Sequence, residues 1–192
     1  MNNKTKTIVG VGLLTALVIV LQALAIGIRF GVFNITLVLI PIIVGAALYG
    51  YWAGAWLGFV FGVVVLLTDA SAFLAVSVPG TIVTCILKGA CAGLAAGFVY
   101  NMLEKKNTVL AVFVAGVVAP VVNTGLFLVG CRLFFYDTIK EWAAGAGFAS
   151  AGAFMIGGLV GVNFLVELAI NLVLSMAIVR IIQLGKKQVI NG

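Results

Sequence analysis

The residues in this sequence that could do chemistry are few, and the most informative of them lie inside long apolar stretches. Lys88 is the one charged residue in TIVTCILKGACAGLAAGFVY, residues 81–100, and Glu167 lies within a second apolar stretch. A charge at the centre of a membrane helix costs about 2.5–3.5 kcal/mol even on a lenient insertion scale, so it normally faces the protein interior and has a partner. We therefore expect Lys88 and Glu167 to meet.

Other polar side chains add hydrogen-bond donors and acceptors around this pair. Asn163 lies four residues before Glu167 on the same helix face, and Thr84 lies one turn before Lys88. Asn123 comes from a third apolar stretch. One ion pair cannot use all these groups, which favours a pocket where Lys88 binds a ligand carboxylate and Glu167 holds Lys88 charged or accepts ligand protons. The alternative is a buried ion pair that only fixes helix register.

Three segments between the apolar stretches are candidates for a lid over this pocket. IRFGVFN ends with Asn34, TDASAFLAVSVPG contains Asp69, and KEWAAGAGF contains Trp142. Aromatic and apolar walls with a few polar anchors are typical of small-molecule sites, so Asn34, Asp69 and Trp142 join the candidate binding residues. Trp142 has an alternative role as an anchor at the membrane interface.

The residue types that are absent exclude several kinds of chemistry. The sequence has no His, which is the commonest general base and metal ligand. Its three cysteines have no CxxC spacing and follow apolar patterns, so we interpret them as packing thiols. We expect no catalytic residue, no metal site and no cofactor. An intramembrane enzyme would also need a nucleophile with its base, or paired carboxylates.

The elements that position the polar residues must be membrane helices. Of the 192 residues, 64% are hydrophobic and 8% are charged, against about 25% charged in an average soluble domain. The sequence thus predicts an all-α integral membrane protein with one domain, residues 1–192, in a lipid bilayer. The six segments long enough to span it are 7–28, 35–50, 52–68, 80–103, 108–135 and 154–184. The second and third are short, and YGYW joins them in a tight helical hairpin.

The charges between these segments indicate their orientation. With the N-terminus inside, the inner positions carry Lys4, Lys6, Lys105, Lys106, Arg180, Lys186 and Lys187 against one acid, Glu104. The outer positions carry Arg29, Asp69, Arg132, Asp137, Lys140 and Glu141, which balance. This positive-inside bias predicts that both termini are cytoplasmic, and it explains the net charge of +6 without a nucleic-acid partner.

The first segment has a second interpretation as a cleaved signal peptide. It has a basic start and ALA at 23–25 as a small-residue cleavage site. Cleavage would leave five spans, but the apolar run is longer than a usual signal core. We therefore expect the first segment to be a span.

Small residues recur every four positions in several predicted helices. The two longest runs are Gly54, Gly58 and Gly62, and Gly89, Gly93 and Gly97. This spacing puts a smooth stripe on one helix face and predicts close packing against another helix. Gly12 and Ala16 repeat the spacing in the first helix, which holds no charge or polar cluster and could instead face a partner protein.

The stretch ALYGYWAGAWLGFVFGVVVLLTD, residues 47–69, resembles the YG-x-x-A-G-x-x-x-G hairpin of the substrate-binding S components of energy-coupling factor (ECF) transporters. The six-span length, the cytoplasmic ends and GLLTALVIVLQ at 12–22 are similar too, and PVVNTGLFLVG at 120–130 resembles pantothenate-type members. The resemblance implies a high-affinity vitamin binder of the bacterial plasma membrane. Such a protein captures its substrate at the outer face and works with a transmembrane coupling subunit and two ATPases. The family's A-x-x-x-A motif for the coupling subunit corresponds to Gly12 and Ala16, where the glycine is a departure.

The ligand that this resemblance favours is pantothenate, and biotin or folate would also suit the ammonium group of Lys88. A metal-transporting member would need His. The sequence has no G-x-x-x-x-G-K-[ST] phosphate loop, so we expect no enzyme here and ATP hydrolysis only in partner subunits. A stand-alone secondary carrier or channel for a small polar solute is the main alternative, although residues 1–96 and 97–192 show no convincing repeat. A structural scaffold would leave the polar cluster unexplained.

Overall fold

The computed structural model describes residues 3–27, 29–30, 33–34 and 37–191, with side chains over 4–25 and 37–186. The α-helices are α1 Asn3–Gly27, α2 Leu39–Tyr49, α3 Tyr51–Thr68, α4 Ser71–Leu74, α5 Val78–Leu103, α6 Thr108–Phe134, α7 Tyr136–Gly145, α8 Ala151–Ala153 and α9 Gly161–Asn191. A π-helical segment, η1 Phe154–Val160, precedes α9. Strands β1 Arg29–Phe30 and β2 Phe33–Asn34 pair as an antiparallel ribbon after α1. The prediction of an all-α architecture is confirmed apart from this ribbon.

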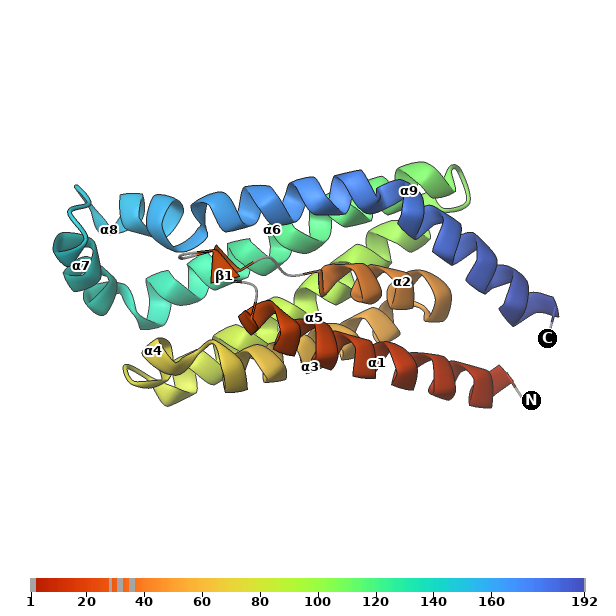
Figure 1. Cartoon of the computed structure of the whole chain (residues 1–192), viewed down its shortest axis with the longest axis horizontal. Helices are drawn as coiled ribbons and strands as arrows, with labels where there is room; N and C mark the ends of the chain where they lie inside the picture. Colours follow the sequence, from red (N-terminus) through yellow and green to blue (C-terminus); the bar gives the residue numbers. More distant parts are fainter. Residues whose placement is uncertain (1–2, 28, 31–32, 35–36, 192) are drawn as a thin grey trace.

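The helices form an elongated bundle, which Figure 1 shows from the side. Helix α3 packs between α1 and α5, α5 packs against α6, and α6 packs against α9. The start of α1 and the end of α9 lie at the same end of the bundle, and α4, α7 and α8 lie at the other end (Figure 1). At the end with the termini, Lys186 of α9 forms an ion pair with Glu104, the residue that follows α5.

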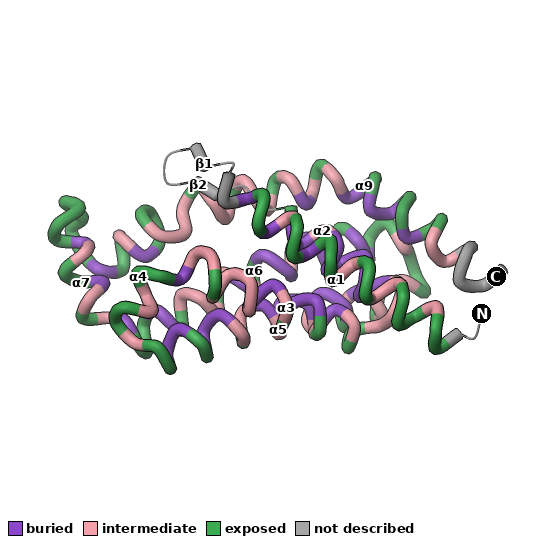
Figure 2. The backbone as a smooth tube through the Cα atoms, turned by 60° about the horizontal axis from the view of Figure 1, so that its bottom comes forward, coloured by how far each residue is buried: buried purple, intermediate pink, exposed green. Residues whose placement is uncertain are grey.

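Five helical stretches are long and apolar enough to cross a membrane, among the described residues. They are Lys4–Ala25, Tyr51–Thr68, Val78–Leu103, Thr108–Phe134 and Ala151–Lys186. In Figure 2 buried residues gather in the middle of the bundle, and exposed residues run along α1 and α9. Large apolar side chains such as Leu13, Leu133 and Val173 are among the most exposed. An apolar exterior of this extent is expected of a protein whose surrounding solvent is lipid.

The predicted span 35–50 differs most from the structure. Residues 35–36 lie outside the described residues, and α2 has 11 residues. At 1.5 Å per residue it is about 16 Å long, roughly half of the 30 Å hydrocarbon thickness. Most of α2 is buried. A helix that is hydrophobic all round belongs to a core, so α2 fills the centre of the bundle and does not face lipid as a full span would.

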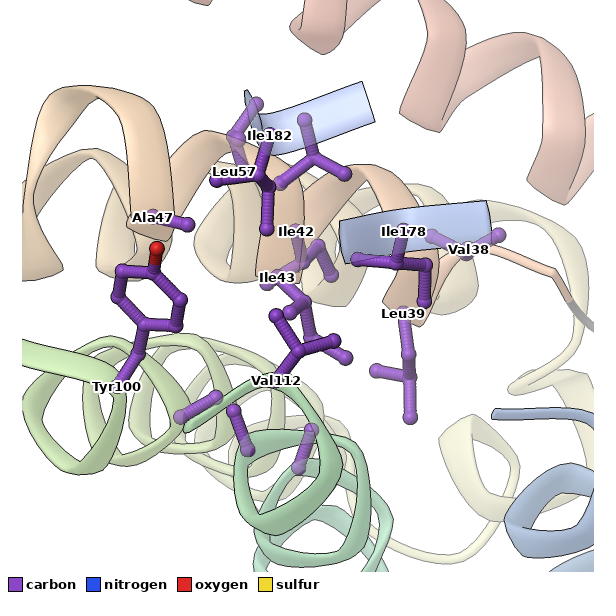
Figure 3. Packing of buried hydrophobic residues seen from close by; sticks show 14 of the residues in the cluster. Val38, Leu39, Ile42, Ile43, Ala47, Leu57, Tyr100, Val112, Ile178 and Ile182 are labelled. Carbon is purple, nitrogen blue, oxygen red and sulfur yellow. The ribbon is translucent and has the colours of Figure 1, made fainter. Parts of the chain in front are cut away.

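Helix α2 makes the centre of the main hydrophobic core, shown in Figure 3. Its Leu39, Ile42 and Ile43 are at most 1% exposed. They belong to one cluster with Val112 of α6 and Ile178 of α9. Each helix that contacts α2 therefore buries part of its apolar face on this short central element.

Local sequence signals explain where the helices begin and end. Gly50 separates α2 from α3 and has a φ of 93°, a left-handed conformation that glycine adopts without steric cost. This turn confirms the hairpin that was predicted from YGYW. The Ser77 hydroxyl accepts from the Gly80 amide at the start of α5. The Asn107 side chain accepts from the amides of Val109 and Leu110 at the start of α6.

The two glycine runs face each other, which confirms the prediction that they serve internal packing. A Cβ atom on Gly54 would overlap the carbonyl group of Gly93, and one on Gly58 would overlap that of Gly89. A Cβ on Gly62 would overlap the carbonyl group of Cys85. The backbones of α3 and α5 therefore touch along most of their shared length. Any larger side chain would separate them.

We predict that Gly58→Val destabilises the protein, because the added side chain meets a backbone carbonyl that cannot rotate away. The cost should reach or exceed the 1–3 kcal/mol, roughly, of an overpacked core. Gly12→Val is the matched control, since a Cβ at Gly12 would have no atom within 4 Å. Melting temperatures of the two variants in detergent should fall for Gly58→Val only. Equal melting temperatures would contradict the close packing of α3 and α5.

Candidate functional site

A cavity of ≈ 230 Å³ lies between α1, α3, α5, α6 and the start of α9, toward the end of the bundle away from the termini. Its wall mixes aromatic, apolar and polar side chains. The lining residues are Gln22, Phe61, Val65, Asp69, Ala70, Phe73, Cys85, Lys88, Asn123, Thr124, Phe127, Leu159, Val160, Asn163, Phe164 and Glu167. This composition, mainly apolar with a few polar groups, is typical of small-molecule sites.

The polar groups of the wall come from several different helices. Gln22 lies in the last turns of α1, and Asp69 is the residue that ends α3. Lys88 lies ten residues beyond Val78, the first residue of α5. Asn123 lies in α6. Five elements must therefore pack correctly before these groups face one space.

Helix α9 presents its polar residues on one face. Asn163 and Glu167 are four residues apart and both line the cavity, as their spacing predicted. The π-helical segment η1 adds Leu159 and Val160 to the same wall. This part of the chain thus lines the cavity with both apolar residues (Leu159, Val160 and Phe164) and polar ones (Asn163 and Glu167).

Lys88 is held by aromatic rings. Its Nζ lies 5.6 Å from the centroid of the Phe61 ring and 5.4 Å from that of the Phe127 ring. Both separations are within the range of a cation–π interaction, in which the ring face attracts the ammonium group. The rings attract the ammonium group without neutralising its charge, which can still attract an anionic group of a ligand.

Lys88 and Glu167, which we expected to meet, both line this cavity. Within the described part of the chain, the ion pairs join Lys140 to Asp137 and Lys186 to Glu104.

Gln22 and Asp69, both in the cavity wall, form a hydrogen bond. The Gln22 side-chain amide donates from Nε2 to Asp69 Oδ2 at 2.8 Å, and the Thr68 hydroxyl donates to the same oxygen at 3.1 Å. Two buried carbonyl oxygens of the wall, Gln22 Oε1 and Asn123 Oδ1, accept no hydrogen bond from the side chains and backbone that the structure describes. Buried polar atoms without partners are uncommon in proteins, and such an atom in a cavity wall is explained if it receives a ligand or a water molecule.

An aromatic cluster covers the cavity from the side of the connecting segments. Phe73 of α4 lines the cavity and makes edge contacts with Phe127, Phe135 and Trp142, at centroid separations of 5.6, 5.0 and 5.5 Å. Trp142 belongs to α7. Two of the three predicted lid segments thus meet at Phe73, and the side chains of the third, residues 28–34, lie outside the described residues.

The structure brings most of the predicted binding residues together. Lys88, Asp69, Asn123, Asn163 and Glu167 all line the cavity.

Two predicted binding residues, Thr84 and Trp142, are outside the lining, and the side chain of a third, Asn34, is not described. Thr84 is not in the lining, because its hydroxyl donates to the Gly80 carbonyl at 2.7 Å and its side chain packs on Gly130. Trp142 reaches the cavity only through Phe73. Asn34 pairs with Arg29 in the ribbon, and its side chain lies outside the described residues.

Three important residues of the wall were not predicted from the sequence. Gln22 ends the stretch GLLTALVIVLQ, and a polar residue at that depth was a signal that could have found it. Phe127 lies four residues after Asn123, on the same helix face. Phe61 lies within the glycine run of α3, directly before Gly62, and carries no comparable signal, since an aromatic residue in a membrane helix is ordinary.

The chemistry of the wall suits binding. Among the described residues, no group of three or more His, Cys, Asp or Glu lies close enough to hold a metal ion. The cavity offers one ammonium group, two carboxylates and several amide groups, which together can orient a small polar molecule.

Comparison with known proteins agrees with this type of site. Residues 6–179 match the family model described as ECF transporter, substrate-specific component. The chain is also 28% identical over 158 residues to the pantothenic acid transporter PanT of Lactococcus lactis subsp. cremoris, strain MG1363, an alignment that covers 75% of each chain. No solved structure matches the chain significantly.

We predict that water-soluble reagents reach the cavity from outside the cell. In a variant with all three cysteines replaced by alanine, Thr124→Cys should react with a charged, impermeant methanethiosulfonate added to intact cells. Val129→Cys on the same helix is the control, because its side chain is 51% exposed on the outer surface of the bundle, where lipid prevents thiol ionisation. Mass spectrometry of the purified protein detects the adduct. Modification of Thr124→Cys in inverted vesicles alone would place the cavity on the cytoplasmic side.

Proposed function

We propose that this chain, which belongs to the family of substrate-specific components of ECF transporters, captures a small carboxylate-bearing vitamin at the outer face of the membrane for ATP-driven uptake by partner subunits. It is a multi-pass protein of the cell membrane. The observation that carries the proposal is Lys88, an ammonium group in the cavity wall that makes no ion pair within the described residues. An ammonium group in such a position is a ready partner for a ligand carboxylate.

Pantothenate is the favoured ligand, and biotin and folate come next. The similarity to the pantothenic acid transporter PanT supports this order. Pantothenate has one carboxylate, two hydroxyls and an amide, so it can use both the ammonium group of Lys88 and the carbonyl and carboxylate oxygens of the wall. A binding panel with pantothenate, biotin, folate and the cationic vitamin thiamine would decide the ligand class.

The proposed topology has six passes with both termini in the cytoplasm. The start of α1 and the end of α9 lie at one end of the bundle, as an even number of passes requires (Figure 1). Helix α2 then supplies the short second pass, from the ribbon to Gly50. The basic residues Lys4, Lys105 and Lys106 belong to this end, and the positive-inside rule assigns it to the cytoplasm.

A partner surface is proposed on α1. Gly12 and Ala16 are both exposed, and a Cβ at Gly12 would meet no atom within 4 Å. This small-residue stripe therefore contributes nothing to packing within the described chain, unlike the glycine runs of α3 and α5. The stripe would let a helix of the transmembrane coupling subunit approach closely, and two ATPase subunits would supply the energy.

We predict that Lys88→Met abolishes vitamin binding, because the ligand carboxylate loses its counter-charge in a partly desolvated site. Removing one partner of such a pair costs about 2–5 kcal/mol, a loss of roughly 30-fold or more in affinity. Isothermal titration of the purified protein in detergent measures it.

Lys140→Met is the charge-matched control, since Lys140 is exposed on α7 and pairs with Asp137. Its affinity should equal that of the wild type. An unchanged affinity in Lys88→Met would overturn the assignment of the carboxylate to Lys88.

We predict that Ala16→Trp blocks uptake but leaves binding by the isolated protein intact, because the bulky ring prevents a partner helix from approaching α1. Uptake is measured in cells that contain the partner subunits, and binding is measured on the purified chain. Loss of both would indicate that Ala16 serves internal packing. Transport by the purified chain in vesicles without an ATPase would favour a stand-alone secondary carrier or channel instead.

A further inference from the structure

We propose that Gln22 is a specificity-determining residue whose side-chain oxygen accepts a hydrogen bond from a neutral donor of the ligand, a hydroxyl or an amide N–H. The cavity would then select carboxylates that also carry such a donor over simple carboxylates of the same size. This inference rests on the proposed function and adds a second recognition element to the charge of Lys88.

The first step is the burial of an unsatisfied acceptor. Gln22 is 2% exposed and lines the cavity, and its Oε1 accepts no hydrogen bond from any described residue. A buried carbonyl oxygen has two lone pairs and is normally satisfied by protein or water. A ligand that supplies a donor at this position gains a hydrogen bond which a ligand without one cannot form.

The second step is the orientation of the amide. Gln22 Nε2 donates to Asp69 Oδ2 at 2.8 Å. An ionised carboxylate only accepts hydrogen bonds, so the nitrogen of the amide must face Asp69 and the oxygen must face away from it. The Thr68 hydroxyl donates to the same Oδ2 at 3.1 Å and reinforces this arrangement. Asp69 is therefore a positioning residue, which keeps Gln22 an acceptor toward the cavity.

The third step is the charge of the wall. Asp69 and Glu167 are its two carboxylates, and Lys88 is its one basic residue, among the side chains that the structure describes. The carboxylate of a ligand belongs at Lys88, away from the two acidic groups. A neutral donor suits the rest of the wall, because it satisfies Gln22 without adding a charge. Asn123, 8% exposed and also with an unsatisfied side-chain oxygen, offers a second acceptor.

The test compares ligands that differ only in their donors. The probes are pantothenate, its dideoxy analogue N-(3,3-dimethylbutanoyl)-β-alanine, and the analogue in which an ester oxygen replaces the amide N–H. All three carry the same carboxylate. The wild type should prefer pantothenate over at least one analogue by about tenfold or more, because a site built to bind a donor rejects ligands that lack it.

In Gln22→Leu this preference should fall to about twofold or less, because the leucine side chain can accept no hydrogen bond. The comparison is made within one protein, so a general loss of folded protein affects all three ligands alike and leaves the ratio unchanged. Gln183→Leu is the matched control, since Gln183 is exposed on α9. It should keep the preference of the wild type.

Asp69→Asn tests the positioning role. An amide at position 69 can donate as well as accept, so the Gln22 amide is free to rotate and present its nitrogen to the cavity. The preference for pantothenate over the analogues should fall, while the analogues themselves still bind. A general structural defect would instead weaken the binding of pantothenate and of the analogues equally.

The outcomes separate this inference from the proposed function. If the wild type binds pantothenate and Gln22→Leu keeps the full preference against both analogues, the role of Gln22 is overturned while the proposed function stands. A wild-type protein that binds none of the vitamins would overturn both.

Discussion

The direct contact between the backbones of α3 and α5 is the constraint on which the rest of the structure depends. Because Gly58 meets Gly89 and Gly62 meets Cys85, the two helices share one fixed register. That register places the Phe61 ring beside the ammonium group of Lys88 and brings Asp69 into the wall of the same cavity. In a bilayer, where the hydrophobic effect does not drive helices together, close packing of small residues supplies the attraction and sets the distance.

A cavity held this tightly can keep a charged side chain ready for a ligand. An ammonium group in an apolar wall needs compensation, and rings supply it more weakly than a carboxylate would. A strong ion pair with Glu167 would have to break before Lys88 could bind an anion. The cation–π contacts with Phe61 and Phe127 stabilise the ammonium group without such an ion pair, so its charge stays available to a ligand.

The sequence predicted the long helices and most polar residues of the cavity, because each rests on a local signal. Helices begin at capping residues such as Ser77 and Asn107, and the position of a residue along its helix follows from counting residues. The short helix α2 was predicted, but its burial at the centre of the bundle was not predictable, since an apolar run has the same letters whether lipid or protein surrounds it. The cation–π contacts of Lys88 and the hydrogen bond from Gln22 to Asp69 depend on side-chain packing between distant segments, which spacing along one helix cannot reveal.

The π-helical segment η1 has a consequence for how relatives of this protein can diverge. A π turn holds one residue more than an α turn, because its hydrogen bonds join residues i and i+5 rather than i and i+4. Such a turn can gain or lose a residue while the helix beyond it keeps its face. Leu159 and Val160 could therefore be exchanged or shifted in evolution without rotating Asn163 and Glu167 away from the cavity. The apolar wall and the polar face of the last helix can therefore change separately in evolution. The cavity can then fit ligands of a different shape while Asn163 and Glu167 stay in place.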